Sequence, residues 1–327
     1  MASFGNLGKV TTLTLAIAAA FCIAGASQAA PTVQASSVLE VLNFQIQSTA
    51  AGHAILDRSN FGNPLIADNG TNSASLTGFA PILNSGNSTN GAPMDILQAC
   101  LGVVCPGQNN FAHNPAPPAG GTQLSRGDSK LDGAPVTGLG QPTGANARTV
   151  AEVRLTGTGT GTGDSRLGLN TSFSFDLASS KSLRFDFDAN LYLRAFLSAD
   201  SMNGSAQASS NLVFGIDRIL GGLATRVFTW SPDGTVDAIL GGTEFADGAN
   251  LNDSVAALVA GDNNFREDGL KHFTADTNLL AAGSYRFTIR HTSAADANQL
   301  IPEPGTLLLA GGALLGLALS RRERKAA

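Results

Sequence analysis

Asp186 and Asp188 are the first residues whose spacing suits acid–base chemistry, because side chains two positions apart lie on one face of a β-strand. Paired carboxylates serve a glycosidase only when a partner lies at the right distance across the scissile bond. Here the pair belongs to an alternating stretch whose other polar residues indicate a solvated sheet face. We therefore interpret both aspartates as surface residues and predict no catalytic residue, with a secreted hydrolase as the less favoured reading.

Other catalytic motifs give no better candidate. The histidines His53, His113, His272 and His291 are far apart and form no H-x-x-x-H pair, and there is no G-x-S-x-G nucleophile elbow. Gly157 to Asp164 reads GTGTGTGD, which lacks the spacing of a phosphate-binding loop. Its alternation predicts a low-complexity strand edge or a flexible hairpin. We expect a protein that is not an enzyme.

Two loops rich in Asp and Asn carry the oxygen ligands that Ca²⁺ prefers. One contains Asp247 and Asp253, and the other contains Asp262 and Asp268. Neither has the spacing of an EF-hand, and such side chains in turns commonly bond to their own backbone. We expect self-satisfied turns, no metal site and no cofactor, with Ca²⁺ at these four aspartates as the alternative.

The N-terminal residues 1–29 have the features of a signal peptide. Lys9 supplies the positive charge, Val10 to about Ala24 is apolar, and small residues precede the predicted cleavage after Ala29. The chain is therefore expected to cross the inner membrane through the Sec translocon.

Cys100 and Cys105 are the cysteines that remain after this cleavage. In an exported chain their spacing predicts a small local disulfide. The alternative is a metal site, which needs two further ligands, and His113 is the histidine nearest in sequence. A disulfide that closes so short a loop would stiffen that loop more than it would stabilise the fold.

The C-terminal residues 301–327 combine three features in a fixed order. A proline-rich motif comes first, then 15 uncharged residues from Gly305 to Leu319, then a basic cluster. The residues are Pro302, Glu303 and Pro304 in the motif, and Arg321, Arg322, Arg324 and Lys325 in the cluster. The apolar run is short for a bilayer, yet arginines that reach into the headgroups allow it to span. It predicts a C-terminal transmembrane helix with the basic end in the cytoplasm.

This order of motif, apolar run and basic cluster resembles the PEP-CTERM sorting signal of exosortase substrates, over residues 301–327 alone. The resemblance implies export in a Gram-negative bacterium and transient anchoring in the inner membrane. It also implies processing by an exosortase near Pro302-Glu303-Pro304 and delivery to the cell surface or the extracellular matrix. Such systems belong to bacteria that make exopolysaccharide.

The body between the two predicted signals is acidic and rich in small polar residues. The chain has 20 basic and 25 acidic residues, and removing Lys9 with the tail's four basic and two acidic residues leaves 15 and 23, a net charge of about −8. An acidic body argues against a nucleic-acid partner. Charged residues form 14% of the chain and Gly, Ser, Thr and Asn are abundant, as is typical of extracellular β-proteins.

Alternation of apolar and polar residues defines the fold class. It is clearest from Leu183 to Arg194, and a turn follows at Ser231 to Gly234. This pattern predicts that residues 149–300 form an antiparallel, jelly-roll-like β-sandwich core and that the protein is mainly β. Residues 30–148 predict a loop-rich β region with a Pro/Gly-rich linker from Pro106 to Gly144. Short helical turns are expected at Met94–Leu101 and Ser254–Val259.

Together these features favour an exosortase-processed surface or matrix protein with a structural or adhesive role in an exopolysaccharide layer. The alternative is a carbohydrate-binding module, for which Trp230 or Tyr192 should lie on an exposed sheet face. The sequence does not specify a ligand, an oligomeric state or the exact processing site.

Overall fold

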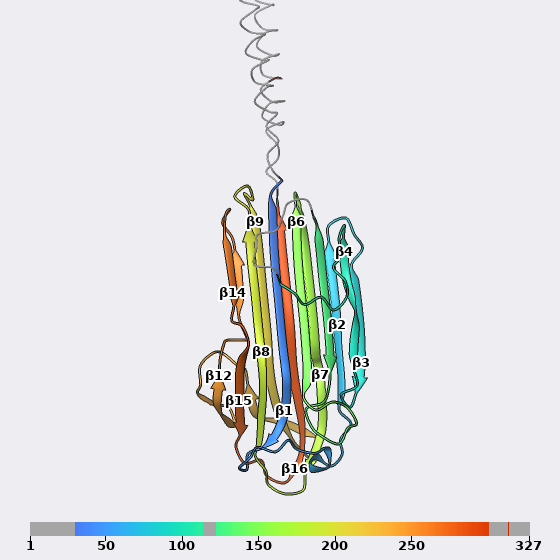
Figure 1. Cartoon of the computed structure of the whole chain (residues 1–327), viewed down its shortest axis with the longest axis vertical. Helices are drawn as coiled ribbons and strands as arrows, with labels where there is room; N and C mark the ends of the chain where they lie inside the picture. Colours follow the sequence, from blue (N-terminus) through green and yellow to red (C-terminus); the bar gives the residue numbers. More distant parts are fainter. Residues whose placement is uncertain (1–29, 114–121, 301–312, 314–327) are drawn as a thin grey trace, which may run out of the picture. The chain divides into compact units, whose positions relative to one another are not determined.

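Figure 1 shows the computed structural model, which describes residues 30–113, 122–300 and residue 313. Strands in two antiparallel sheets make up 65% of it, so the predicted mainly β, two-sheet class is confirmed. Within these residues no helix is long and apolar enough to cross a membrane. The predicted signal peptide and the predicted transmembrane segment, Gly305–Leu319, lie outside the described residues.

The first sheet has nine strands. In spatial order they are β11 (Ala238–Ile239), β12 (Gly242–Asp247), β15 (Lys271–Thr277), β8 (Leu183–Leu197), β1 (Thr32–Ser48), β6 (Ala145–Thr156), β5 (Leu124–Asp132) and β4 (Met94–Gly102), with β14 (Asn263–Glu267) also paired to β8. The long strand β1 is interior, because it pairs with β6 on one side and β8 on the other.

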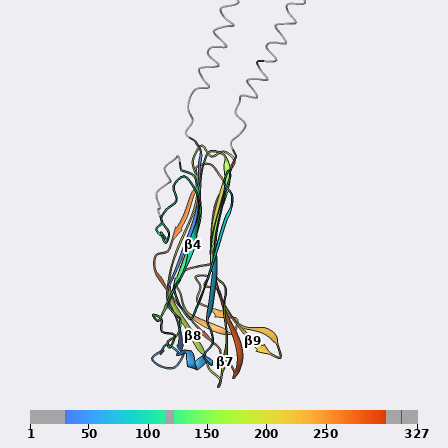
Figure 2. The same ribbon diagram turned by 90° about the vertical axis from the view of Figure 1, so that its right-hand side faces the viewer.

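The second sheet has seven strands and lies against the first, as the turned view in Figure 2 shows. Its order is β10 (Leu223–Trp230), β9 (Gly204–Leu220), β16 (Gly283–Gln299), β7 (Gly159–Leu177), β2 (Ala67–Leu76) and β3 (Ile82–Thr89), with β13 (Ser254–Ala257) also paired to β9. A short 3-10 helix, η1 (Arg58–Phe61), precedes β2. The two sheets together hold more strands than the eight of a simple jelly roll.

The two halves of the chain share both sheets. The predicted boundary between residues 148 and 149 falls inside β6, and β1 and β2 from the first half pair with β8 and β7 from the second. Within the predicted linker, β5 is paired on both sides, so that part of Pro106–Gly144 is strand instead of exposed loop. Polar side chains such as Ser125 and Asp128 are buried there, which is why composition alone indicated a loop.

Two predicted helical turns are strands in the structure. Met94–Gly102 forms β4, in which Met94 and Ile96 are buried while Asp95 and Leu97 are exposed. Ser254–Ala257 forms β13 and pairs with β9. Both segments are short, and pairing with a neighbouring strand outweighs a weak helical preference.

Aromatic rings fill one half of the space between the sheets. A β-bulge between Val41 and Phe44 on β1 accompanies this cluster, in which the Phe44 ring lies 5.3 Å from that of Phe214. The Phe214 ring lies 5.2 Å from Trp230. Offset and edge-on contacts between rings add to the free energy gained by burying them.

Glycines lie at points in the other half of the interior where the two sheets approach closely. A Cβ added to Gly127 on β5 would lie 2.0 Å from Asp164 O, and one added to Gly163 on β7 would lie 2.3 Å from Arg126 O. The glycines of GTGTGTGD therefore permit the backbones to meet. This stretch enters β7, which pairs with β16 and β2, so the predicted strand edge or flexible hairpin is wrong beyond the turn at Gly157.

Candidate functional site

The strand that leads into the sorting motif, β16, is an interior strand of the second sheet. Its last residue, Gln299, pairs with Gly159 of β7 and with Gly204 of β9, and its side chain is fully buried. Gln299 Nε2 donates to Leu300 O at 3.0 Å, and Leu300 N donates to Asn203 O at 3.5 Å. The folded body therefore continues to residue 300. Pro302, Glu303, Pro304 and the basic cluster from Arg321 to Lys325 lie outside the described residues.

The first strand, β1, begins at the same end of the sandwich. Thr32 pairs with Thr156, its N donates to Ser198 Oγ at 2.9 Å, and its O accepts from Ser201 Oγ at 3.0 Å. A Cβ added to Gly204 would lie 2.7 Å from Gln299 Oε1 and 3.3 Å from Val33 Cγ2. We call this end, where β1 starts and β16 stops, the terminal end (Figure 1). The predicted cleavage after Ala29 lies three residues before Thr32.

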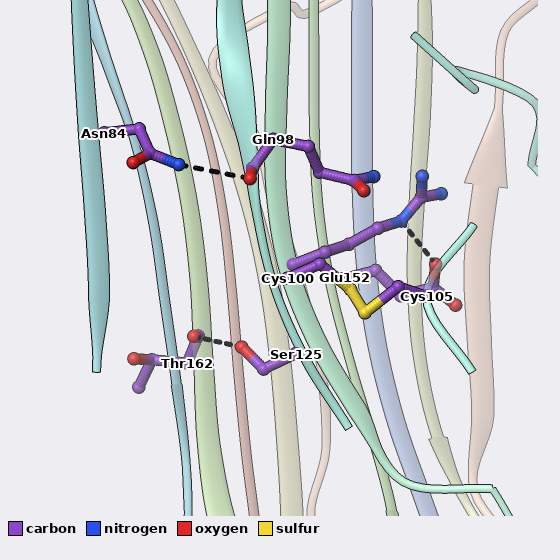
Figure 3. Close-up of a disulfide and its surroundings, with 8 residues drawn as sticks. Asn84, Gln98, Cys100, Cys105, Ser125, Glu152 and Thr162 are labelled. Atoms are coloured by element: carbon purple, nitrogen blue, oxygen red, sulfur yellow. Dashed lines mark hydrogen bonds and ion pairs between the residues drawn. A yellow bond between two sulfur atoms is a disulfide. The ribbon is translucent and has the colours of Figure 1, made fainter. Parts of the chain in front are cut away.

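A disulfide joins Cys100 on β4 to Cys105, with the Cα atoms 6.0 Å apart (Figure 3). The segment after β4, residues 103–113, is called the covering segment here because it packs on the outer face of the first sheet. Its Phe111 contacts Val38, Val150 and Tyr192 in a small buried cluster.

Polar contacts also bind the covering segment to the first sheet. Asn109 N donates to Asp128 Oδ2 at 2.6 Å, and Arg126 Nη1 donates to Asn110 O at 2.8 Å. The His113 ring stacks on Tyr192 at 4.3 Å. Burial raises the pKa of the Asp128 carboxyl and of the Tyr192 hydroxyl.

Glu152 on β6 is the centre of a buried ion-pair network beside this segment. It is 7% exposed and accepts from Arg126 Nε at 3.0 Å, from Arg154 Nη2 at 3.1 Å and from Gln34 Nε2 at 3.1 Å. Arg126 itself is 3% exposed. The three donors satisfy a buried carboxylate that would otherwise be costly. This network joins β1, β5 and β6 within the first sheet.

The paired carboxylates Asp186 and Asp188 meet a histidine instead of another acid. His272 Nδ1 lies 3.0 Å from Asp188 Oδ1, and His272 Nε2 lies 3.5 Å from Asp186 Oδ2. The two aspartates thus face opposite ring nitrogens and do not converge on one ion. Among the described residues, no group of three His, Cys, Asp or Glu side chains is arranged to hold a metal. A glycosidase that uses two carboxylates holds them on opposite sides of the scissile bond, whereas Asp186 and Asp188 lie on one face of β8.

The four aspartates considered as Ca²⁺ ligands bond to protein groups. Asp247 Oδ2 accepts from Asp233 N at 2.8 Å and from Gly234 N at 3.0 Å, and burial raises the pKa of the Asp247 carboxyl. Asp262 Oδ2 accepts from two backbone N–H groups at 3.0 and 2.9 Å. Asp253 and Asp268 both pair with Arg266. Asp262 thus closes its own turn, Asp247 holds the separate turn at Asp233, and Asp253 and Asp268 are joined through Arg266 on β14.

The aromatic residues that a sugar platform would require are internal. Trp230 is 0% exposed, and Tyr192 and Tyr285 are each 1% exposed. The carbohydrate-binding alternative required Trp230 or Tyr192 on an exposed sheet face, and neither side chain is exposed. Alternation placed Trp230 on a strand, but the face that it occupies depends on sheet pairing.

An open groove on the outer face of the second sheet was not found by sequence reasoning. It encloses about 380 Å³ and is lined by Asp164, Arg166, Asn211, Arg290 and Thr292. These residues come from β7, β9 and β16 and meet through strand register. One sequence contains no signal for that register.

The body is thus a two-sheet antiparallel β-sandwich whose last strand runs directly into a C-terminal signal. Residues 300–322 match the PEP-CTERM protein-sorting motif, which confirms the resemblance drawn from the tail. The motif indicates an exosortase-targeted protein that is exported to the cell surface or beyond in a Gram-negative bacterium.

The other comparisons add little. No curated protein matches the chain. Among solved structures, the infectious bursal disease virus VP2 subviral particle aligns over 91% of this chain and 89% of that chain at 12% identity. The TM-score of 0.09 supports no comparison of folds.

Proposed function

We propose that this protein is a non-enzymatic structural or adhesive component of an exopolysaccharide layer. It is exported through the Sec translocon, anchored transiently in the inner membrane by Gly305–Leu319, and released by an exosortase. The observation that carries this proposal is the match of residues 300–322 to the sorting motif, directly after a rigid interior strand. No cofactor and no nucleic acid take part in this function.

The sorting step is tested in the native host, with and without its exosortase. Replacing Pro302-Glu303-Pro304 by alanines should leave an unprocessed chain in the inner membrane, as should deletion of the exosortase. The readouts are intact mass and cell fractionation. The control variant L220A/L223A changes two exposed leucines on the hairpin between β9 and β10 and should be processed normally. Normal processing and delivery of the alanine variant would contradict the proposal.

A second candidate function is carbohydrate binding in the groove of the second sheet. Arg166 pairs with Asp164 there, so Arg290 is the exposed cation that faces the groove beside Asn211 and Thr292. A guanidinium with neighbouring amide and hydroxyl groups suits the carboxylates and hydroxyl groups of acidic sugars. R290A should weaken binding to an acidic polysaccharide at least about tenfold, a loss of about 1.4 kcal/mol. R148A, on the outer face of the first sheet, is the control. Equal binding by R290A and the unmodified protein would count against this candidate.

A further inference from the structure

Exposed apolar side chains gather at the terminal end of the sandwich. They come from the loop between β2 and β3, the start of the covering segment, the loop between β8 and β9, the loop after β13, and the residue after β16. They are Phe79, Val103, Val104, Met202, Leu258, Val259 and Leu300, each at least 46% exposed.

Strand register places these loops together. Leu76 pairs with Gly161, and Gly102 pairs with Leu124, which in turn pairs with Arg154 near the end of β6. Leu197 N donates to Asp262 O at 2.8 Å, and this hydrogen bond ties the loop after β13 to the end of β8. Exposed apolar side chains that gather in one region of a protein surface mark a site of contact with another apolar phase.

Charge is nearly absent from the same loops. Residues 77–81, 103–104, 157–158, 198–203 and 258–262 contain neither lysine nor arginine, and their acids are Asp200 and Asp262. Asp262 already accepts two backbone hydrogen bonds. An end with so few charges loses little hydration free energy when it leaves water.

The length of chain between this end and the apolar tail is very short. Leu300 is the last residue of the body, and the uncharged run starts at Gly305, so five residues cover at most about 17 Å. One headgroup region is about 5–8 Å thick. A body tethered by so short a segment cannot move far from the bilayer into which Gly305–Leu319 inserts.

We propose that the terminal end rests on the phospholipid surface while the tail is anchored, with its exposed apolar side chains in the headgroup region. This inference rests on the proposed anchoring of the tail. Without basic residues the end gains no attraction to anionic lipids, so its own affinity is weak and reversible. Cleavage near Pro302-Glu303-Pro304 therefore frees the body from the membrane.

The test uses residues 30–327, the chain that remains after the predicted cleavage, so that flotation reports on the C-terminal segment. The protein is reconstituted in phosphatidylethanolamine/phosphatidylglycerol vesicles with the Cys100–Cys105 disulfide kept oxidised. An environment-sensitive fluorophore is attached to L258C at the terminal end or to L279C in the loop that follows β15. These leucines are matched in exposure, at 71% and 70%. Brominated lipids should quench the label at position 258 at least about twofold more than the label at position 279.

Flotation separates the inference from the function on which it rests. A chain that does not float with the vesicles overturns the anchoring and the inference together. A chain that floats but shows equal quenching at positions 258 and 279 overturns the inference alone. A third outcome would also overturn the inference. If the fluorescence of the label at position 258 changes only when exosortase is added, the terminal end contacts the enzyme and not the lipid.

Discussion

His291 Nε2 lies 2.9 Å from Thr149 Oγ1, and this contact connects the two sheets through their buried interior. Thr149 Oγ1 also lies 2.8 Å from Ser293 Oγ, so a short polar chain runs from β6 to β16. Burial lowers the pKa of His291 to about 3, and the imidazole is therefore neutral at pH 7. Asp68 and His291 both line a small pocket of about 60 Å³ between the sheets.

The first prediction is acid sensitivity that depends on His291. The folded pKa is below the unfolded value of about 6.5, so the unfolded state binds more protons between these limits. Stability is complete above about pH 6.5 and falls as the pH decreases, by about 2 kcal/mol at pH 5. H291Q should remove this part of the slope, and H53Q, at an exposed site, should keep it. Urea unfolding at pH 7.5, 6 and 5 measures it, and equal slopes in both variants would contradict the assignment.

The second prediction concerns the close approach of the sheets. G163A should lower the free energy of unfolding by about 3 kcal/mol, because the new Cβ meets the backbone of the opposite sheet. G107A is the control, since a Cβ there meets nothing within 4 Å. Chemical denaturation compares the two. A G163A variant as stable as G107A would show that the sheets separate there at little cost.

The third prediction tests the buried ion-pair network. E152A leaves Arg126 buried without its carboxylate and should cost about 3 kcal/mol or more. The matched surface change is E40A, which removes a partly exposed pair with Arg148 and should cost at most about 1 kcal/mol. Both values come from urea unfolding at pH 7. Similar losses in the two variants would contradict the burial argument.

The fourth prediction concerns the disulfide. Replacing Cys100 and Cys105 by serine should cost about 2 kcal/mol, the chain-entropy value for a closed loop of six residues. The covering segment should exchange its Asn109 amide hydrogen faster in this variant, while amides in β16 keep their protection. Hydrogen exchange followed by mass spectrometry provides both readings. A loss of more than about 4 kcal/mol would mean that the disulfide stabilises the whole fold.

The sequence predicted those features that depend on local pattern. Alternation in Leu183–Arg194 identified β8, and the order of prolines, apolar run and arginines identified the sorting motif. The sequence-based prediction failed for segments whose secondary structure depends on pairing with a neighbouring strand. Met94–Leu101 has no strong period, and its strand state comes from β5, which was itself assigned to a linker because its buried residues are polar.

For the candidate sites too, the sequence predicted what depends on local pattern and missed what depends on strand pairing. Asp186 and Asp188 were correctly placed on one strand face, but the approach of His272 from β15 depends on a register that no local pattern encodes. Trp230 was placed on a strand without knowledge of which face is covered. The groove beside Arg290 requires three strands that are remote in sequence, so it emerges only from the assembled sheet.

The connection of the tail to β16 also determines how the body responds to force. Residues Gly283 to Gln299 are hydrogen bonded to β7 and β9 on both sides. A force applied at the C-terminus acts along the direction of β16. The hydrogen bonds to β7 and to β9 are then loaded together in shear, and they are not broken one after another. A body held by this end, as it is while the tail is anchored, would keep its fold under load until both ladders yield together.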